Sequence, residues 1–256
     1  MNSVAVIPAR FASTRFPGKP LALLMGKPLV EHVYERALAC TAISRVIVAT
    51  DDKRIFAAVR GFGGDCMMTS PDHRSGSDRL GEVAGNIDAD VIVNIQGDEP
   101  MIAPEVIGAV LEAMDTEAPP PIVTAAAPLS GPEEYHDPDV VKVLVDVQGK
   151  ALYFSRSPIP YGWTGGDSGL KHIGIYAYQK DALLDFVSLP MGKLECLEGL
   201  EQLRALENGM GIDVVRVEGF TGIGVDSPED LKRVERIMME MAKEAGNTRT
   251  PGREGA

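Results

Sequence analysis

The sequence predicts an α/β fold built around a mixed, mostly parallel sheet. In the first half, short apolar runs alternate with segments whose apolar residues have helical spacing, which is typical of βαβ units. In the second half, several strands follow one another with few helices between them, which predicts that the sheet is mixed. With 256 residues, of which 45% are hydrophobic, the chain can bury a large core.

The elements of the first half are predicted in strict alternation. Short apolar runs such as VIVNI indicate buried strands at 3–7, 45–50, 65–69 and 91–95. Helical spacing of apolar residues places helices at 28–40, 52–62, 77–87 and 104–114. Pro104 suits the first turn of its helix, where the N–H group that proline lacks would have no partner within the helix.

The second half is predicted to begin with four strands, at 122–127, 140–147, 151–155 and 172–178. Helices at 180–187 and 195–208 follow, then a strand at 213–217 and a final helix at 228–245. The final helix has a good start, because Ser227 can cap it and Pro228 suits its first turn. We expect a single domain over residues 1–245 and a disordered polar tail over 246–256.

Composition excludes several classes of protein. A net charge of −12 argues against nucleic-acid binding, which favours a basic face. No apolar segment approaches the ~20 residues that a membrane helix needs. Cys40, Cys66 and Cys196 are widely spaced and odd in number, which favours reduced thiols. No secretion signal opens the sequence, so we expect a cytoplasmic protein.

The loop after the first strand, PARFASTRFPGKP at 8–20, concentrates positive charge in an acidic protein. Arg10, Arg15 and Lys19 could hold a polyphosphate, with Ser13 and Thr14 as further donors. Ligands of open α/β sheets collect at the carboxyl ends of strands, where this loop lies. The alternative is a solvated surface loop. Neither a Walker A motif nor GxGxxG occurs in the chain.

Two aspartates follow distant apolar runs and are candidate metal ligands. Asp98 belongs to VIVNIQGDEP at 91–100, and Asp226 belongs to GIGVDSPED at 222–230. Carboxylates at strand ends that face a polyphosphate are suited to Mg²⁺. For the first segment the alternative is an ordinary turn. In the second, the helix start explains Ser227 onward but leaves Asp226 free.

The segment SPDHRSGSDRL at 70–80 could close over a nucleotide through Arg74 and Arg79. Ser77 is predicted to cap the helix that follows, and His73 to lie at the surface without a specific role. Later segments could build an acceptor pocket in which Arg156 binds a substrate carboxylate. Glu201 and Gln202 could bind sugar hydroxyls, although such residues usually lie on an exposed helix face.

Taken in order, these segments resemble the 3-deoxy-manno-octulosonate cytidylyltransferases, also called CMP-Kdo synthetases. The matching motifs are IPARFASTRFPGKPL, IVATDD, DHRSGSDRL, VIVNIQGDEPMI, VVKVLVD, ALYFSRSPIP, HIGIYAY, LEQLR and GIGVDSPEDL. The resemblance implies a glycosyltransferase-A-like three-layer fold, known from nucleotide-diphospho-sugar transferases, and usually a homodimer. It implies a nucleotide-binding half at about 1–128 and a sugar-binding and dimerisation half at 129–245.

The resemblance also implies a reaction, in which CTP and Kdo give CMP-Kdo and pyrophosphate for lipopolysaccharide biosynthesis. Asp98 and Asp226 would hold Mg²⁺, and Lys19 and Arg10 would complete the catalytic group. The nucleotide-binding residues that it implies are Pro8, Ala9, Arg10, Ser13, Arg15, Lys19, Asp51, Arg74, Ser75 and Gly76. The sugar-binding residues that it implies are Gln96, Arg156, His172, Tyr176, Glu201 and Gln202.

Two alternatives stay open from the sequence. One is a cytidylyltransferase for 8-amino-Kdo or another 2-keto acid sugar. The other is a nucleotide-binding protein of the same fold without catalysis, although the presence of both aspartates disfavours it.

Overall fold

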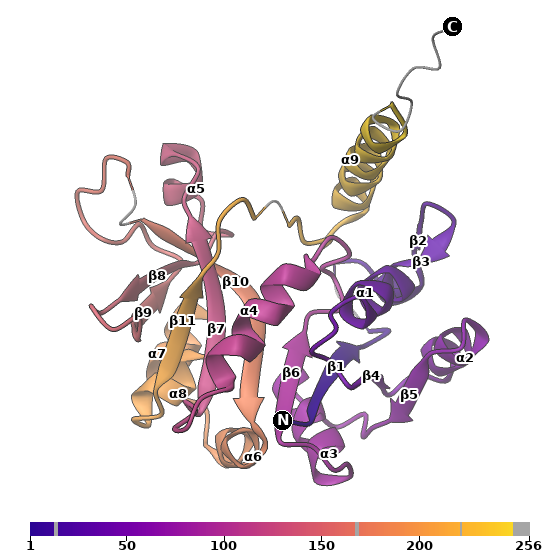
Figure 1. Ribbon diagram of the computed structural model, residues 1–256, viewed down its shortest axis with the longest axis horizontal. Coiled ribbons are helices and arrows are strands. Elements are labelled where there is room, and N and C mark those ends of the chain that lie inside the picture. The colour runs from indigo at the N-terminus through magenta and orange to yellow at the C-terminus, as the bar shows by residue number, and fades with distance from the viewer. Residues whose placement is uncertain (13–14, 167–168, 221, 248–256) are drawn as a thin grey trace, which may run out of the picture.

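The computed structural model describes residues 1–12, 15–166, 169–220 and 222–247. Over these residues one twisted sheet runs through the molecule in the order β11-β7-β10-β6-β1-β4-β5 (Figure 1). The bounds of these strands are β1 Ser3–Ala9, β4 Arg45–Thr50, β5 Asp65–Met68, β6 Val91–Ile95, β7 Ile122–Pro128, β10 Leu170–Gln179 and β11 Ile212–Arg216. Strands β8 (Lys142–Val145) and β9 (Ala151–Ser155) form a hairpin that pairs with β10 through β8.

The sheet is mixed as predicted, because β10 is antiparallel to the strands with which it pairs. Strand β1 is parallel to β4 and β6, and β5 is parallel to β4. Strand β11 is parallel to β7, whereas β10 is antiparallel to β6 and β7. Strand β10 therefore joins the two halves of the chain into one continuous sheet.

Helices cover both faces of the sheet and make three layers. On one face, α1 (Leu29–Leu38), α2 (Lys53–Gly61) and α4 (Pro104–Met114) contribute to a core with Ala5 and Ile7 of β1. On the other, α3 (Gly76–Gly85), α6 (Lys180–Ser188) and α8 (Leu203–Glu207) contribute to a core with Val4 and Val6. Strands buried on both faces explain why the first half reads as continuous apolar runs.

The predicted helix at 195–208 is wrong, because the chain forms two short helices there. Helix α7 (Lys193–Glu198) ends at Gly199, whose φ of +63° is left-handed, and α8 begins only at Leu203. Glycine adopts this conformation without the steric cost that a Cβ imposes. Glu201 and Gln202 therefore lie in the turn between two helices and not on an exposed helix face.

The sequence also missed several short elements. These are the 3₁₀ turn η1 (Lys19–Leu21), the hairpin of β2 (Leu23–Leu24) and β3 (Lys27–Pro28), and α5 (Pro132–His136). The final helix, α9, spans Pro228–Asn247, two residues beyond the predicted boundary at 245, and extends away from the sheet (Figure 1). Within the described ranges, none of the helices has both the length and the apolar character to cross a bilayer.

The break at Gly199 can be tested by substitution. We expect Gly199→Ala to lower the free energy of unfolding by about 1 kcal/mol, because alanine is strained at positive φ. Gly108 is the matched control, since it lies inside α4 and a Cβ there would meet nothing within 4 Å. Gly108→Ala should raise the free energy of unfolding by about 0.5–1 kcal/mol in the same urea titration. Equal stabilisation by both substitutions would contradict the left-handed turn.

Candidate active site

The carboxyl ends of β1 and β6 meet at one edge of the sheet, because these two strands are parallel neighbours. The chain leaves β6 through Gly97, which approaches the backbone of Pro8 closely. A Cβ at Gly97 would lie 2.9 Å from the carbonyl oxygen of Pro8, closer than real Cβ contacts come. Only glycine therefore allows the loop after β6 to lie directly beside the loop after β1.

The basic loop after β1 is closed by its own backbone. The Gly18 amide donates to the carbonyl of Phe11 at 2.9 Å, and Gly18 has a φ of +73°. Lys19 follows as the first residue of η1, so the backbone position from which its side chain extends is fixed. Arg10, Arg15 and Lys19 all line one hollow of about 390 Å³. This hollow is called the basic hollow below.

Two of the other predicted nucleotide contacts line the basic hollow as well. Pro8 and Ala9 line it at the end of β1. The predicted contact of Ser13 lies outside the described residues.

Lys19 lies between the two aspartates predicted as metal ligands. Its Nζ atom donates to Asp98 Oδ2 at 2.8 Å and to Asp226 Oδ1 at 3.1 Å. The Arg15 guanidinium pairs with the other oxygen of Asp226 at 3.0 Å. Burial acts to lower the pKa of Lys19, but the charges and hydrogen bonds of Asp98 and Asp226 outweigh it and raise that pKa. Lys19 is therefore a permanent cation that joins two carboxylates from distant parts of the chain.

A third carboxyl group stands beside this pair. Burial, reinforced by the negative charges of Asp98 and Asp226, raises the pKa of Glu99 to about 8. Glu99 is consequently protonated near neutral pH, and its Oε2 atom is buried without a hydrogen-bond partner among the described residues. The negative charges of Asp98 and Asp226 are thus balanced by the positive charges of Lys19 and Arg15.

Asp98 and Asp226 form a donor set that fits Mg²⁺. This ion is usually held by one or two carboxylates together with substrate phosphates and water, not by a closed protein cage. The described part of the chain contains no group of three or more His, Cys, Asp or Glu side chains that could hold a metal ion. The two aspartates are accessible enough for such a role, with side chains 31% and 47% exposed.

The loop before α3 lies against the basic loop. Arg10 donates to the carbonyl of Arg74 at 3.3 Å, and both residues line a second hollow of about 630 Å³ together with Ser75 and Gly76. The prediction that Ser77 caps α3 is wrong. The cap is Ser75, whose hydroxyl accepts from the amide of Asp78 while the Asp78 carboxylate accepts from the amide of Ser75.

Two residues of this region have partners that the sequence did not indicate. His73, predicted to lack a specific role, lies 2.5 Å from Glu82 through its Nε2 atom. Asp51, predicted as a nucleotide contact, accepts a hydrogen bond at 2.8 Å from Arg79, which is completely buried. Arg79 also contacts the hydroxyl of Thr69. Arg79 therefore fixes the end of β4 from inside the protein, and Asp51 lines none of the hollows described above.

Most of the predicted sugar-binding residues gather in a third hollow, called the acceptor hollow here. It has a volume of about 200 Å³ and is lined by Gln96, His172, Tyr176, Glu201 and Gln202, among others. Gln96 lines the basic hollow as well, so the two hollows adjoin. The turn between α7 and α8 brings Glu201 to this place.

Glu201 is held in position by two neighbours. The hydroxyl of Ser77 donates to Glu201 Oε2 at 2.7 Å, which explains why Ser77 is buried although it caps nothing. Arg204 lies 3.4 Å from the other oxygen and is itself paired with Glu195 at 2.6 Å. A carboxylate with both oxygens contacted in this way presents its remaining acceptor positions in a defined direction.

His172 has a defined tautomer. Thr124 has a single hydroxyl hydrogen, and its Oγ1 atom lies 2.6 Å from the carbonyl of Ile175, to which it donates. The same Oγ1 must then accept from His172 Nε2 at 2.9 Å, so Nε2 carries the proton. Burial lowers the pKa of His172 to about 3. His172 is therefore neutral near pH 7, and its Nδ1 atom is a hydrogen-bond acceptor.

Arg156 is the predicted sugar contact that lies apart from the others. Its Nε atom donates to the carbonyl of Glu198 at 3.0 Å, and a terminal nitrogen donates to the carbonyl of Pro138 at 2.9 Å. It lines neither the acceptor hollow nor the basic hollow. A contact between Arg156 and the sugar would require the guanidinium to leave these carbonyls.

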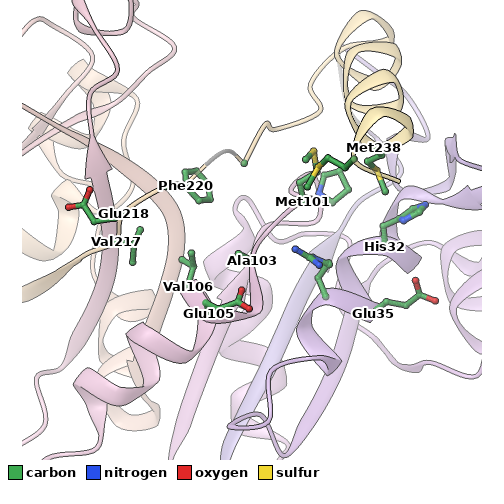
Figure 2. A pocket seen from close by; sticks show the side chains of 15 residues that line it. His32, Glu35, Met101, Ala103, Glu105, Val106, Val217, Glu218, Phe220 and Met238 are labelled. Carbon is green, nitrogen blue, oxygen red and sulfur yellow. The ribbon is translucent and has the colours of Figure 1, made fainter. Parts of the chain in front are cut away.

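A larger cavity of about 800 Å³ has none of the predicted site residues in its lining. Its lining comes from α1, the residues before α4 and its first turn, residues 217–220 with Gly222, and α9, as the labelled side chains in Figure 2 show in part. Glu35, Glu105 and Glu218 line it, and its Arg36 donates to the carbonyl of Ile102 at 2.8 Å. A cavity with this charge is a poor site for a triphosphate, so its size does not make it the active site.

Asn94 is a polar residue of the site that sequence motifs did not single out. It lies in β6, lines the acceptor hollow and is only 3% exposed. The sequence did carry a signal, because an asparagine interrupts the otherwise apolar run VIVNI. Buried polar side chains in strands normally have a specific partner.

The state of His172 can be read directly by NMR spectroscopy. We expect the ¹⁵N and ¹H shifts of its imidazole to report a neutral ring protonated at Nε2 from pH 8 down to about pH 5, because burial holds its pKa near 3. Titration of His172 near pH 6.5, or a proton on Nδ1, would contradict this assignment.

Comparisons with known proteins identify the family of the chain. Residues 4–212 match the model of a family described as cytidylyltransferase. A 3-deoxy-manno-octulosonate cytidylyltransferase of Syntrophotalea carbinolica is 51% identical over 245 residues, which cover 92% of this chain and 98% of the relative. A second enzyme of that name, from Geobacter sulfurreducens, is 51% identical over 249 residues and covers 91% of this chain and 98% of the relative.

Comparison with solved structures identifies the fold. A CMP:2-keto-3-deoxy-manno-octonic acid synthetase complexed with CTP superposes with a TM-score of 0.90 at 45% identity, covering 94% of this chain and 100% of that one. An inositol-1-phosphate CTP transferase from T. maritima shares the fold alone, with a TM-score of 0.65 at 16% identity and coverage of 93% and 95%. The fold is therefore that of the nucleotide-diphospho-sugar transferases. The chain belongs to the 3-deoxy-manno-octulosonate cytidylyltransferase family.

Proposed function

We propose that this chain transfers the cytidylyl group of CTP to 3-deoxy-D-manno-octulosonate (Kdo), giving CMP-Kdo and pyrophosphate. The observation that carries the proposal is the placement of Lys19 between Asp98 and Asp226, in a basic hollow that shares Gln96 with the acceptor hollow. A nucleotide triphosphate and a sugar could then meet at one point of the sheet edge. Relatives named for this reaction, about half identical to the chain, support it.

In the proposed reaction, the anomeric hydroxyl of Kdo attacks the α-phosphorus of CTP. The bond from that phosphorus to the bridging oxygen breaks, pyrophosphate leaves, and the hydroxyl proton is lost. Such transfers ask little covalent chemistry of a protein, so positioning of the reactants and neutralisation of charge dominate. Arg10, Arg15 and Lys19 provide positive charge where the leaving group gains negative charge.

Lys19 is well placed for this role because its ammonium group has three N–H donors. Two of them are used by Asp98 and Asp226, and the third remains for a phosphate oxygen. The raised pKa keeps Lys19 charged throughout the physiological range. The same contacts hold the side chain still, so little rotamer freedom is lost when the nucleotide binds.

Asp98 and Asp226 would hold Mg²⁺ together with the phosphates of CTP. When bound, the ion would neutralise phosphate charge and lower the pKa of the sugar hydroxyl. The protein keeps the two carboxylates at fixed positions relative to each other. The amide of Val225 donates to the carbonyl of Asp98 at 2.9 Å, and the Asp226 amide donates to the Asp230 carboxylate at 3.1 Å.

We also propose a cytoplasmic location, a role in lipopolysaccharide biosynthesis and a homodimer. Free Cys196 is exposed, which suits a reducing compartment. Large apolar side chains are exposed in the second half of the chain, among them Leu152 at 60%, Tyr161 at 102% and Leu197 at 82%. Exposed apolar surface of this kind often marks a protein contact. Light scattering by the purified chain would report its oligomeric mass.

The function is tested by measuring pyrophosphate release. We expect release from CTP, Mg²⁺ and Kdo, and loss of release when EDTA removes the divalent ion. Replacement of Kdo by its 8-amino analogue tests the alternative acceptor, and replacement of CTP by UTP tests the nucleotide. Release with the 8-amino sugar alone would move the assignment to that acceptor. Binding of CTP without release with either sugar would favour a protein without this catalysis.

The role of Asp98 is tested by Asp98→Asn, which keeps the shape of the side chain and removes its charge. We expect kcat to fall on the order of 100-fold or more, because the amide is a poor ligand for Mg²⁺ and a poor partner for Lys19. Asp65→Asn is the matched control, since Asp65 pairs with Arg45 at 2.5 Å at the far edge strand. That variant should change kcat by no more than about twofold. Full activity of Asp98→Asn would remove Asp98 from the metal site.

A further inference from the structure

The acceptor hollow has an unusual charge for a site that must take an acidic sugar. Of the described residues that line it, none is lysine or arginine, whereas Glu201 contributes a carboxylate. His172 adds no positive charge because its ring is neutral near pH 7. A substrate carboxylate placed here would be desolvated without a cationic partner, at a large cost in free energy.

Asn94 lies on the sheet wall of this hollow with an unused hydrogen-bonding atom. It stands directly opposite Tyr176 in the antiparallel pair of β6 and β10. Although Asn94 is only 3% exposed, its Oδ1 atom has no hydrogen-bond partner among the described residues. An unpaired buried amide oxygen destabilises the free protein, and a native chain rarely leaves one without a reason.

Two other groups of the hollow, on His172 and Glu201, are hydrogen-bond acceptors like Asn94 Oδ1. His172 presents Nδ1 as an acceptor, because its Nε2 proton is used by Thr124. Glu201 is an acceptor by its charge, and the hydroxyl of Ser77 is already donated to it. The hollow therefore offers several acceptors beside the donors of its amide and tyrosine side chains, and no cation. Hydroxyl groups, which both donate and accept, are complementary to such a lining.

We propose that Asn94 is a further sugar-binding residue, which accepts a hydrogen bond from a hydroxyl on the polyol end of the acceptor sugar. The polyol end then occupies the acceptor hollow, while the carboxylate and the neighbouring anomeric carbon stay beside Gln96, at the basic hollow. This deepens the proposed function and rests on it. The orientation agrees with the chemistry, because the anomeric hydroxyl must reach the α-phosphate near Lys19 and Asp98.

The test is Asn94→Leu, which keeps the approximate size of the side chain and removes the acceptor. We expect the KM for Kdo to rise roughly tenfold or more, because a sugar hydroxyl would lose its partner on binding. The KM for CTP should stay within about twofold, since Asn94 does not line the basic hollow. The thermal unfolding midpoint should stay equal or rise, because the substitution removes an unpaired buried oxygen. Asn94→Ala is measured in parallel in case leucine prevents folding.

The opposite directions of these two effects separate binding from support of the fold. A residue that only supports the strand would lower the unfolding midpoint and leave the KM for Kdo unchanged. Ser3 is the matched control, because its hydroxyl is also buried without a partner among the described residues, at the other end of β1. Ser3→Ala should leave both KM values at the wild-type level.

Kdo analogues that each lack one hydroxyl identify the partner of Asn94. One analogue should have a raised KM with the wild-type chain and show no further rise with Asn94→Leu, because both changes remove the same hydrogen bond. A wild-type KM for Kdo in both Asn94 variants would overturn the proposal and leave the proposed function standing. The same holds if every analogue responds equally to the substitution. A wild-type chain that releases no pyrophosphate with Kdo would overturn both.

Discussion

The contact of Lys19 with Asp98 and Asp226 connects the three segments on which the site depends. Lys19 follows β1, Asp98 follows β6, and Asp226 lies two residues before the final helix. Without a cation between them, the two carboxylates would repel one another. Burial is the main cause of the raised pKa of Glu99, and the charges of Asp98 and Asp226 raise it further. The ammonium group of Lys19 thus reduces the repulsion between Asp98 and Asp226 and allows them to lie close together in the folded protein.

This contact is possible because the sheet brings its strand ends together. Strands β1 and β6 are parallel neighbours, so the loops that follow them emerge at the same edge. Gly97 then allows the two loops to touch, since any larger residue would meet the carbonyl of Pro8. The proposed chemistry therefore requires β1 and β6 to be parallel neighbours. Gly97 makes the close approach of the loops after these strands sterically possible. The Lys19 side chain is then long enough to contact both Asp98 and Asp226.

The parts of the molecule that could be predicted from the sequence are those that local pattern determines. Apolar runs predicted the strands of the first half, and the two aspartates stood out because each follows an apolar run. The start of α9 was also readable, and Ser227 and Asp230 do cap it reciprocally. These features depend on neighbours a few residues away, which a sequence displays directly.

The parts that could not be predicted depend on contacts between distant segments. Ser77 and Ser75 are equivalent candidates for a helix cap by local pattern, and only the position of Glu201 shows why Ser77 is needed elsewhere. Gly199 interrupts a segment whose composition is otherwise helical, and its left-handed turn was not separable from a tolerated helical glycine. Arg156 looked suited to a carboxylate by its chemistry, but backbone carbonyls already occupy its guanidinium.

The two adjoining hollows differ in charge, and this difference can orient a substrate without a conformational change. The basic hollow attracts anionic groups through Arg10, Arg15 and Lys19, whereas the acceptor hollow offers Glu201 and neutral polar groups. A molecule with a carboxylate at one end and hydroxyls at the other has only one favourable orientation across such a boundary. The reversed orientation would bury the carboxylate near Glu201 and leave the hydroxyls among cations that they cannot neutralise. Because the carbon to be activated is bonded to the carboxylate, the arrangement that satisfies the charges also places the reacting hydroxyl beside the phosphates.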